Sequence, residues 1–204
     1  MKKLLSLTLV LLMLTGLMCS AALAGDVYAL NEETLTLEQG PIWYFLYFDE
    51  SDEGVHPLNP TPMWGDNWQF SENPQGDNVY HSICEWDGIQ AMPGTWMGKH
   101  IDIVVAFKAP KDGTVTIEPM EFVIKDDGNE HPNYFVAIAF TKADGETTTQ
   151  LFPINADENF AETPVTTEAI TLDVEEEDFI FFSIHATDDG GAAVSVMPVI
   201  TYAD

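Results

Sequence analysis

Arginine is absent from this chain of 204 residues, and seven lysines stand against 34 acidic residues, which gives a formal net charge of −27. All the acidic residues and five of the lysines follow Ala24, so this later part has a net charge near −29 (five minus 34). Such a surface repels nucleic acid, anionic lipid and polyanionic glycans. Without arginine the chain also lacks the usual forked donor for carboxylate and phosphate. Neutral glycans, cations and basic proteins remain as partners.

Cysteine is almost as scarce, because the chain contains only Cys19 and Cys84. If the segment before residue 25 is removed, no disulfide can form within the chain, and the apolar core must supply the stability. Roughly 180 residues are enough for one such core. A lone cysteine is more often a small buried apolar residue than a nucleophile, and this is the expectation for Cys84.

The first 24 residues have the pattern of a secretory signal peptide. Lys2 and Lys3 give a basic start, residues 4–18 are mostly apolar, and Ala-Leu-Ala at 22–24 resembles a cleavage site. We therefore expect a secreted, extracellular protein. The alternatives are a retained membrane anchor and lipidation at Cys19, although Met18 is larger than the residue that usually precedes a lipidated cysteine. No later stretch has the length and apolarity of a membrane span.

Helical periodicity is missing from the rest of the chain, where short β-rich runs alternate with turn residues at roughly ten-residue spacing. The runs cover residues 42–48, 79–86, 101–108, 114–124, 134–141, 147–152, 169–174, 179–185 and 193–202. This spacing predicts an all-β protein, an antiparallel β-sandwich or barrel of about nine or ten strands. We expect a short linker at 25–33 and a single domain at 34–204. Residues 56–78 show no period and are expected to form a long loop.

Residues 101–124 show the pattern most clearly. Apolar residues at 101, 103, 105 and 107 share one parity, as do those at 115 and 117, across a Pro-Lys-Asp-Gly turn. This period of two predicts a pair of half-buried strands. Pro110 presets the φ of a turn, and Gly113 tolerates the positive φ that often closes one.

Four stretches resemble, in their order, the jelly-roll β-sandwich modules of large secreted bacterial polysaccharide-processing and surface proteins. They are WYFLY at 43–47, APKDGTVTI at 109–117, DFIFFSI at 178–184 and PVITY at 198–202. Glu177 takes the place of the glycine that precedes the aspartate in those modules. The resemblance implies a jelly-roll sandwich and a non-catalytic, carbohydrate-binding-like module.

All five tryptophans lie between residues 43 and 96, and Trp43 falls in an apolar run typical of a core. Aromatic faces can stack on the apolar face of a pyranose ring, and polar side chains nearby can bond to its hydroxyl groups. Residues 63–69 combine both kinds of side chain. The predicted ligand-binding residues are Trp64, Asp66, Asn67, Trp68, Gln69, Trp86 and Trp96. The alternative is packing, because a tryptophan buries a large area on folding.

Three acidic loops, at 49–54, 126–130 and 188–190, offer the oxygen ligands that calcium prefers, but none has EF-hand spacing. We expect solvated turns there, and we predict no metal site and no cofactor. The five histidines, at 56, 81, 100, 131 and 185, show no metal-binding spacing and are expected to be isolated.

No catalytic residues are predicted, because the chain lacks a G-x-S-x-G elbow and a recognisable catalytic frame around Cys84. Glu85 and Asp87 come nearest to a carboxylate pair, but catalysis by two carboxylates also needs a cleft. We therefore predict a secreted, non-catalytic module for a neutral polysaccharide. One alternative is a protein-interaction module of an extracellular or cell-surface assembly, and another is a glycan-cleaving enzyme.

Overall fold

The computed structural model describes eleven stretches of the chain. They are residues 25–36, 38–49, 54–61, 67–69, 82–85, 88–96, 99–124, 134–145, 148–152, 164–186 and 193–204. In these stretches every regular element is a β-strand, and the strands pair antiparallel. The same stretches contain no helix long and apolar enough to cross a membrane. The predicted fold class, an all-β antiparallel sandwich, is confirmed.

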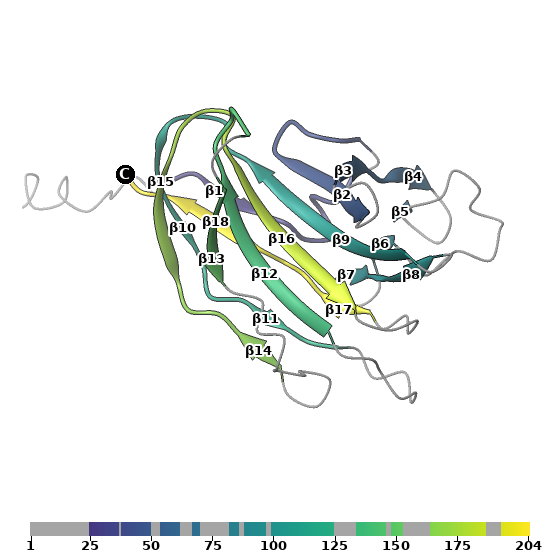
Figure 1. Cartoon of the computed structure of the whole chain (residues 1–204). Coiled ribbons are helices and arrows are strands. Elements are labelled where there is room, and N and C mark those ends of the chain that lie inside the picture. The colour runs from purple at the N-terminus through teal and green to yellow at the C-terminus, as the bar shows by residue number, and fades with distance from the viewer. Residues whose placement is uncertain are drawn as a thin grey trace, which may run out of the picture.

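One layer of the molecule is a seven-stranded sheet, which lies toward the viewer in Figure 1. In pairing order its strands are β13 (Thr148–Phe152), β12 (Tyr134–Thr141), β16 (Phe179–Ala186), β9 (Lys99–Lys108), β2 (Trp43–Asp49) and β3 (Gly54–Pro57), with β8 (Gly94–Trp96) paired to β9. The longest of them, β9, is hydrogen-bonded to β16 on one side and to β2 on the other.

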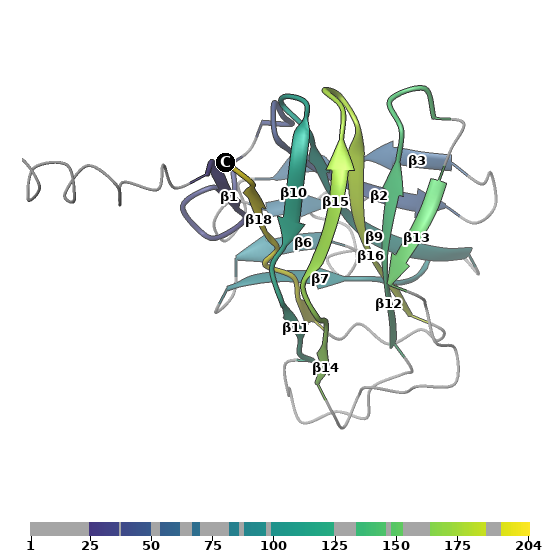
Figure 2. The same ribbon diagram turned by 90° about the vertical axis from the view of Figure 1, so that its left-hand side faces the viewer.

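Three smaller sheets form the second layer, whose four-stranded part faces the viewer in Figure 2. The four-stranded sheet contains β1 (Val27–Ala29), β18 (Val199–Tyr202), β10 (Gly113–Ile117) and β15 (Ile170–Val174). The two-stranded sheet contains β11 (Glu121–Phe122) and β14 (Val165–Thr166). The five-stranded sheet contains β17 (Val194–Ser195), β7 (Ile89–Met92), β6 (Ser82–Glu85), β5 (Asn67–Gln69) and β4 (Asn59–Thr61).

Prolines interrupt the strands of the second layer and so divide it into separate sheets. Pro119 separates β10 from β11 and Pro198 separates β17 from β18, because proline has no N–H to give to a sheet. The backbone still joins the smaller sheets, since the N–H of Ser195 in β17 donates to the carbonyl oxygen of Val123, directly after β11, at 2.9 Å. The three sheets therefore act as one layer opposite the first, which is the arrangement of a jelly-roll sandwich.

The core between the layers is built from every second residue of the strands. Phe45, Val105 and Phe182 lie side by side on β2, β9 and β16, and each is at most 1% exposed. Val115 and Ile117 of β10 are fully buried in the second layer. Burial of one such side chain stabilises the fold by about 1.5–3 kcal/mol. The inward-facing parity predicted from the sequence is therefore correct.

Short strands account for most differences from the prediction. The described stretches contain 18 strands, and many of these have only two to four residues, which is too few to show a period. Three of them, β3, β4 and β5, include residues that we expected to form a loop. Another, β1, lies in the expected linker, but it pairs with β18, so the folded region begins before residue 34.

The turn at residues 110–113 joins the two layers. It leads from β9 in the first layer to β10 in the second, so the two runs that we predicted as a pair face each other across the core. Gly113 does not have the predicted positive φ. Glycine is needed there because a Cβ atom would lie 2.9 Å from the ring of Tyr202.

Three turns meet at one end of the sandwich around the carboxylate of Asp178, which is 1% exposed. This carboxylate accepts hydrogen bonds from the N–H of Ala143 at 2.9 Å, the N–H of Glu175 at 2.8 Å and the ammonium of Lys142 at 3.1 Å. The backbone oxygen of Asp178 accepts a hydrogen bond from the N–H of Ala109 at 2.8 Å. We call this arrangement of turns 109–112, 142–145 and 175–178 the Asp178 hub.

Asp178→Ala is expected to lower the free energy of unfolding by about 2–4 kcal/mol, because two backbone N–H groups and a lysine lose their acceptor at a buried position. Urea denaturation measures the difference. Glu176→Ala in the same turn is the control, and because Glu176 is exposed its effect should stay within about 0.5 kcal/mol. Equal stability of the two variants would contradict a structural role for the hub.

Glu177 has a φ of +74°, and among the described residues it is the one non-glycine with a positive φ. It occupies the position where the modules that the sequence resembles carry glycine. The left-handed conformation costs a residue with a side chain about 1–2 kcal/mol. An ion pair with Lys108 at 2.6 Å offsets little of this cost, because the glutamate side chain is 63% exposed.

Glu177→Gly is therefore expected to raise the free energy of unfolding by about 0.5–1 kcal/mol. Glu177→Ala removes the same ion pair but keeps the unfavourable φ, so it should leave the stability unchanged or slightly lower. Thermal unfolding of both variants separates the effects. A gain in the alanine variant equal to that in the glycine variant would show that backbone conformation is not the cause.

Candidate functional site

The structure places the predicted ligand-binding residues only in part. Trp64, Asp66 and Trp86 lie outside the described residues. The backbone of Asn67, Trp68 and Gln69 forms β5 between β4 and β6, and Trp96 ends β8. The side chains of these four residues are not within the described part of the chain. Binding at these positions stays a prediction.

A second surface, the outward face of the seven-stranded sheet, is rich in aromatic rings. Residues that lie directly opposite each other in paired strands point to the same side of a sheet. We call this surface the ring-lined face. Its residues are Tyr44, Leu46 and Phe48 of β2; His100, Asp102, Val104, Ala106 and Lys108 of β9; Phe179, Phe181, Ser183 and His185 of β16; and Phe135, Ala137, Ala139 and Thr141 of β12.

Three rings cluster at the end of this face that is nearer the Asp178 hub. The ring centroids of Tyr44 and Phe179 are 5.8 Å apart in an edge-to-face contact, and those of Phe179 and Phe181 are 5.6 Å apart and stacked. All three residues are half-buried. Their mutual contacts hold the rings in place while part of each remains accessible.

Histidine and aspartate side chains mark the other end of the face. The Nδ1 atom of His185 lies 2.5 Å from the Oδ1 atom of Asp102. The His185 ring is 5.6 Å from the His100 ring and stacks on Phe135 at 6.0 Å. We expected isolated histidines, but the register of β9 and β16 brings these two together. Hydrogen-bonding groups therefore lie beside rings here.

Small side chains fill the middle of the face. The row between the two ends contains Leu46 and the smaller Val104, Ser183 and Ala137, and Val104 is only 3% exposed. Tyr44 and Phe48 are four residues apart on β2, so the two groups of rings are about 13 Å apart along the strands. Ala106 and Ala137 are at most 8% exposed as well, so this middle part is closely packed and the accessible rings lie at its two ends.

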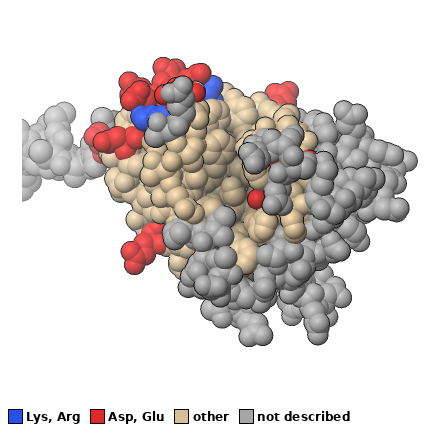
Figure 3. Space-filling view, in the orientation of Figure 1, with Lys and Arg blue, Asp and Glu red and all other residues tan. Residues whose placement is uncertain are grey.

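The ring-lined face carries little charge. Figure 3 shows mainly uncharged residues over β9, β12 and β16, with acidic and lysine side chains gathered at the end occupied by the Asp178 hub. Among the described residues of the face, Asp102 is the one carboxylate and is paired with His185, and Lys108 is the one lysine and is paired with Glu177. An outward sheet surface usually alternates apolar and polar residues. This one is suited to contact with an uncharged partner.

The sequence analysis did not predict this face. A signal for it was present, since WYFLYF at 43–48 and FIFF at 179–182 are apolar at both parities. Such runs indicate contact on both sides of a strand. Only the pairing of β2, β9 and β16 shows that the outward halves of these runs lie together.

The acidic loops and the carboxylate pair that the sequence offered for metal binding and catalysis lie mostly outside the described residues. Among the described residues no group of three or more His, Cys, Asp and Glu side chains could hold a metal ion. The three acidic loops considered for calcium lie outside the described residues, except for Asp49 and Gly54. Glu85 ends β6, and Asp87 is outside the described part.

Cys84 lies on β6 as a free cysteine and is half-buried. Burial raises the pKa of its thiol from 9.0 to about 11. The thiolate is the nucleophilic form of cysteine, so the reactive form is scarce at neutral pH. This environment agrees with the expectation of a small apolar residue.

No protein-family model and no curated protein sequence matches this chain. Solved structures are similar in fold. A xylan-binding module, CBM15, is 12% identical, with 88% of this chain and 98% of that chain covered and a TM-score of 0.39. The CBM22-1 xylan-binding domain of Paenibacillus barcinonensis Xyn10C is 13% identical, with coverages of 89% and 98% and a TM-score of 0.39.

The C-terminal CBM6 of the Zobellia galactanivorans enzyme LamC is also similar, at 13% identity, coverages of 86% and 99%, and a TM-score of 0.32. All three similar structures are carbohydrate-binding modules. At these identities and TM-scores the likenesses assign neither a ligand nor a binding residue to this chain.

Cys84 is expected to react about a hundredfold more slowly at pH 8 than a thiol with the ordinary pKa, because each unit of pKa lowers the thiolate population about tenfold. The rate should rise about tenfold per pH unit up to the raised pKa. Release of a chromophore from a disulfide reagent measures this reaction. The chain unfolded in urea is the control, and a native rate equal to the unfolded one would contradict the described burial.

Proposed function

We propose that this protein is a non-catalytic carbohydrate-binding module that holds a neutral glycan against the ring-lined face. The observation that carries the proposal is the gathering of half-buried rings, small residues and one polar pair on an outward sheet face of low charge. The ordered motifs that resemble secreted polysaccharide-binding modules support the same function.

The rings supply the apolar part of the contact. An aromatic ring has a negative face, which attracts the slightly positive C–H groups on the apolar side of a pyranose ring. Tyr44, Phe179 and Phe181 offer such surface in a fixed arrangement. A chain of sugar units that lies along the strands would contact the ring groups at both ends of the face.

The polar groups and the overall charge set the class of glycan. Asp102 and His185 lie beside Phe135, where they can exchange hydrogen bonds with sugar hydroxyl groups. A net charge near −27 opposes the approach of acidic polysaccharides. The proposed ligand is therefore a neutral polysaccharide.

The tryptophan-bearing segment remains a second proposed contact. We propose that Trp64 and Trp68, with Asp66, Asn67 and Gln69, add to glycan binding, and that Trp86 and Trp96 contribute in the same way. This proposal rests on the mixture of aromatic and polar residues in the sequence. Mutation of these tryptophans separates the contribution of this segment to glycan binding from that of the ring-lined face.

A binding role without catalysis fits the composition of the ring-lined face. Glycosidases commonly use two carboxylates at a defined separation, whereas the described part of this face has Asp102 alone. Export to the cell exterior, which the first 24 residues predict, would bring such a module to its polysaccharide.

The double variant Tyr44→Ala and Phe181→Ala is expected to weaken binding to a neutral polysaccharide by about tenfold or more per ring removed, because stacking area is lost. Isothermal titration against soluble xylan, β-glucan and mannan measures this, with polygalacturonate as an acidic control that should not bind. Trp64→Ala with Trp68→Ala is the comparison for the loop segment.

If the Tyr44 and Phe181 variant keeps its affinity for the polysaccharide and the tryptophan variant loses it, the binding site lies in the tryptophan-bearing segment and not on the ring-lined face. Absence of binding to every neutral polysaccharide would reject the function and favour a protein partner for the same face. New reducing ends during incubation would instead show a glycan-cleaving enzyme.

A further inference from the structure

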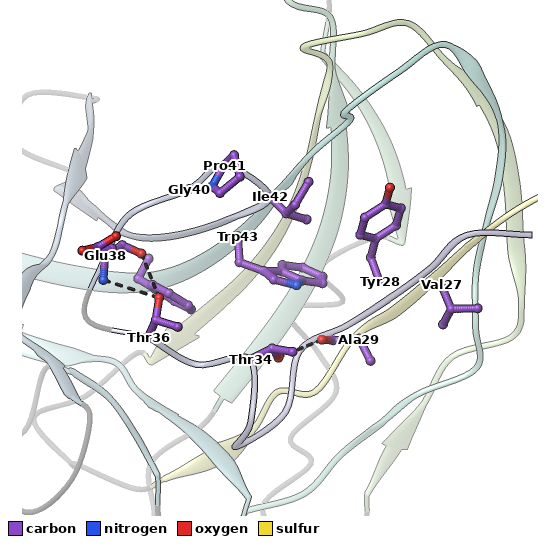
Figure 4. A pocket seen from close by; sticks show the side chains of 11 residues that line it. Val27, Tyr28, Ala29, Thr34, Thr36, Glu38, Gly40, Pro41, Ile42 and Trp43 are labelled. Carbon is purple, nitrogen blue, oxygen red and sulfur yellow. Dashed lines mark hydrogen bonds between the residues drawn. The ribbon is translucent and has the colours of Figure 1, made fainter.

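A pocket opens on the side of the sandwich between β1 of the second layer and the start of β2 in the first (Figure 4). Its volume is about 330 Å³, within the range of small-molecule sites. The lining residues are Val27, Tyr28, Ala29, Thr34, Thr36, Glu38, Gly40, Pro41, Ile42, Trp43 and Phe45. The segment between β1 and β2 closes the pocket, and none of the binding residues considered above belongs to it.

Hydrogen bonds within that segment fix the wall of the pocket. The hydroxyl of Thr34 donates to the carbonyl oxygen of Ala29 at 2.8 Å, and the hydroxyl of Thr36 donates to the carbonyl oxygen of Glu38 at 3.2 Å. Figure 4 shows both contacts on the wall that the segment forms. The pocket is therefore held open by the backbone of its own rim.

Trp43 provides an unpaired donor in the pocket. Its side chain is 7% exposed and packs edge-to-face on Phe107, with ring centroids 5.4 Å apart. No described residue accepts a hydrogen bond from its indole N–H. The Nε1 atom is not among the buried polar atoms that lack a partner, so it is open to solvent, and a ligand oxygen can replace water there.

The other walls define the chemistry that the pocket accepts. Tyr28 and Trp43 present aromatic surface, and Val27, Ala29 and Ile42 present aliphatic surface. Its lining contains one carboxylate, Glu38, and no lysine, so the local field repels an anion. A neutral ring with one apolar face and several hydroxyl groups matches both the rings and the indole donor.

Gly40 separates the pocket from the ring-lined face. It lines the pocket, and a Cβ atom there would lie 2.8 Å from the hydroxyl oxygen of Tyr44, which points to the outward face. Trp43 and Tyr44 are adjacent in sequence and point to opposite sides of β2. The two surfaces are therefore distinct sites.

From these observations we infer that the pocket is a second binding site, which takes a single neutral sugar unit whose oxygen accepts a hydrogen bond from the indole N–H of Trp43. This inference goes beyond the proposed function, because it assigns a separate site for one ring rather than for a polysaccharide chain. It does not depend on glycan binding at the ring-lined face.

The indole ¹H–¹⁵N signal of Trp43 reports directly on this site, and it is assigned by its loss in Trp43→Phe. D-Glucose, D-xylose, D-galactose and D-mannose are titrated into the full-length protein, with D-glucuronate as an anionic probe and benzene as an apolar one. We expect a saturable shift with at least one neutral sugar and none with glucuronate. The shift should persist in the Tyr44→Ala and Phe181→Ala variant, which separates this site from the ring-lined face.

Ala29→Leu extends a wall side chain into the pocket and should abolish the shift, whereas Ala203→Leu alters an exposed alanine outside it and should not. Trp43→Phe keeps a ring but removes the donor, and should weaken binding of the same sugar about three- to tenfold by titration calorimetry. Far-ultraviolet dichroism verifies that each variant is folded.

Three results would overturn the inference. They are no shift with any of the four neutral sugars, a shift that survives in folded Ala29→Leu, and equal affinity in folded Trp43→Phe. A response to benzene alone would show an apolar cavity and would reject a sugar as its ligand.

Discussion

A single buried carboxylate holds together the end of the sandwich at which the chain passes between its layers. Asp178 accepts hydrogen bonds from the turns on both sides of it, and Lys142 balances its charge. Without arginine anywhere in the chain, a lysine must take this role. Because the turn after β9 and the turn before β16 are bonded to each other here, the hub fixes how the two layers stand relative to each other. The alignment of β9 with β16, and with it the ring-lined face, depends on that position.

Burial on both sides of the seven-stranded sheet links the fold to the proposed function. The inward halves of β2, β9 and β16 form the core, and their outward halves carry rings where a solvated sheet would carry polar groups. Apolar surface that a folded protein leaves partly accessible can mark a binding site. The acidic residues then serve a complementary purpose, since they keep the rest of the surface in water and repel anionic polymers.

The sequence allowed the fold class and the inward parity to be predicted, because alternation in β9 and β10 is visible without any knowledge of pairing. The residues that form the hub were also visible as motifs in the sequence, but the contacts that require those residues were not. Gly113 is glycine because the Tyr202 ring packs over it, and Glu177 stands at a positive φ that favours glycine. These are contacts between distant segments, as is the meeting of Asp102 with His185, and single-sequence periodicity cannot reveal them. Strands of two or three residues, such as β1, were missed for the same reason, since pairing rather than pattern defines them.

The distribution of lysines has a consequence for the lifetime of the protein among digestive enzymes. Proteases that cleave after basic residues find only five candidate positions beyond residue 24. At three of these the ammonium group is held by an acidic side chain: Lys108 by Glu177, Lys111 by Asp26 and Lys142 by Glu175. A module built in this way presents few cleavage sites to trypsin-like enzymes, and its scarcity of positive charge thereby favours persistence in a hydrolytic environment.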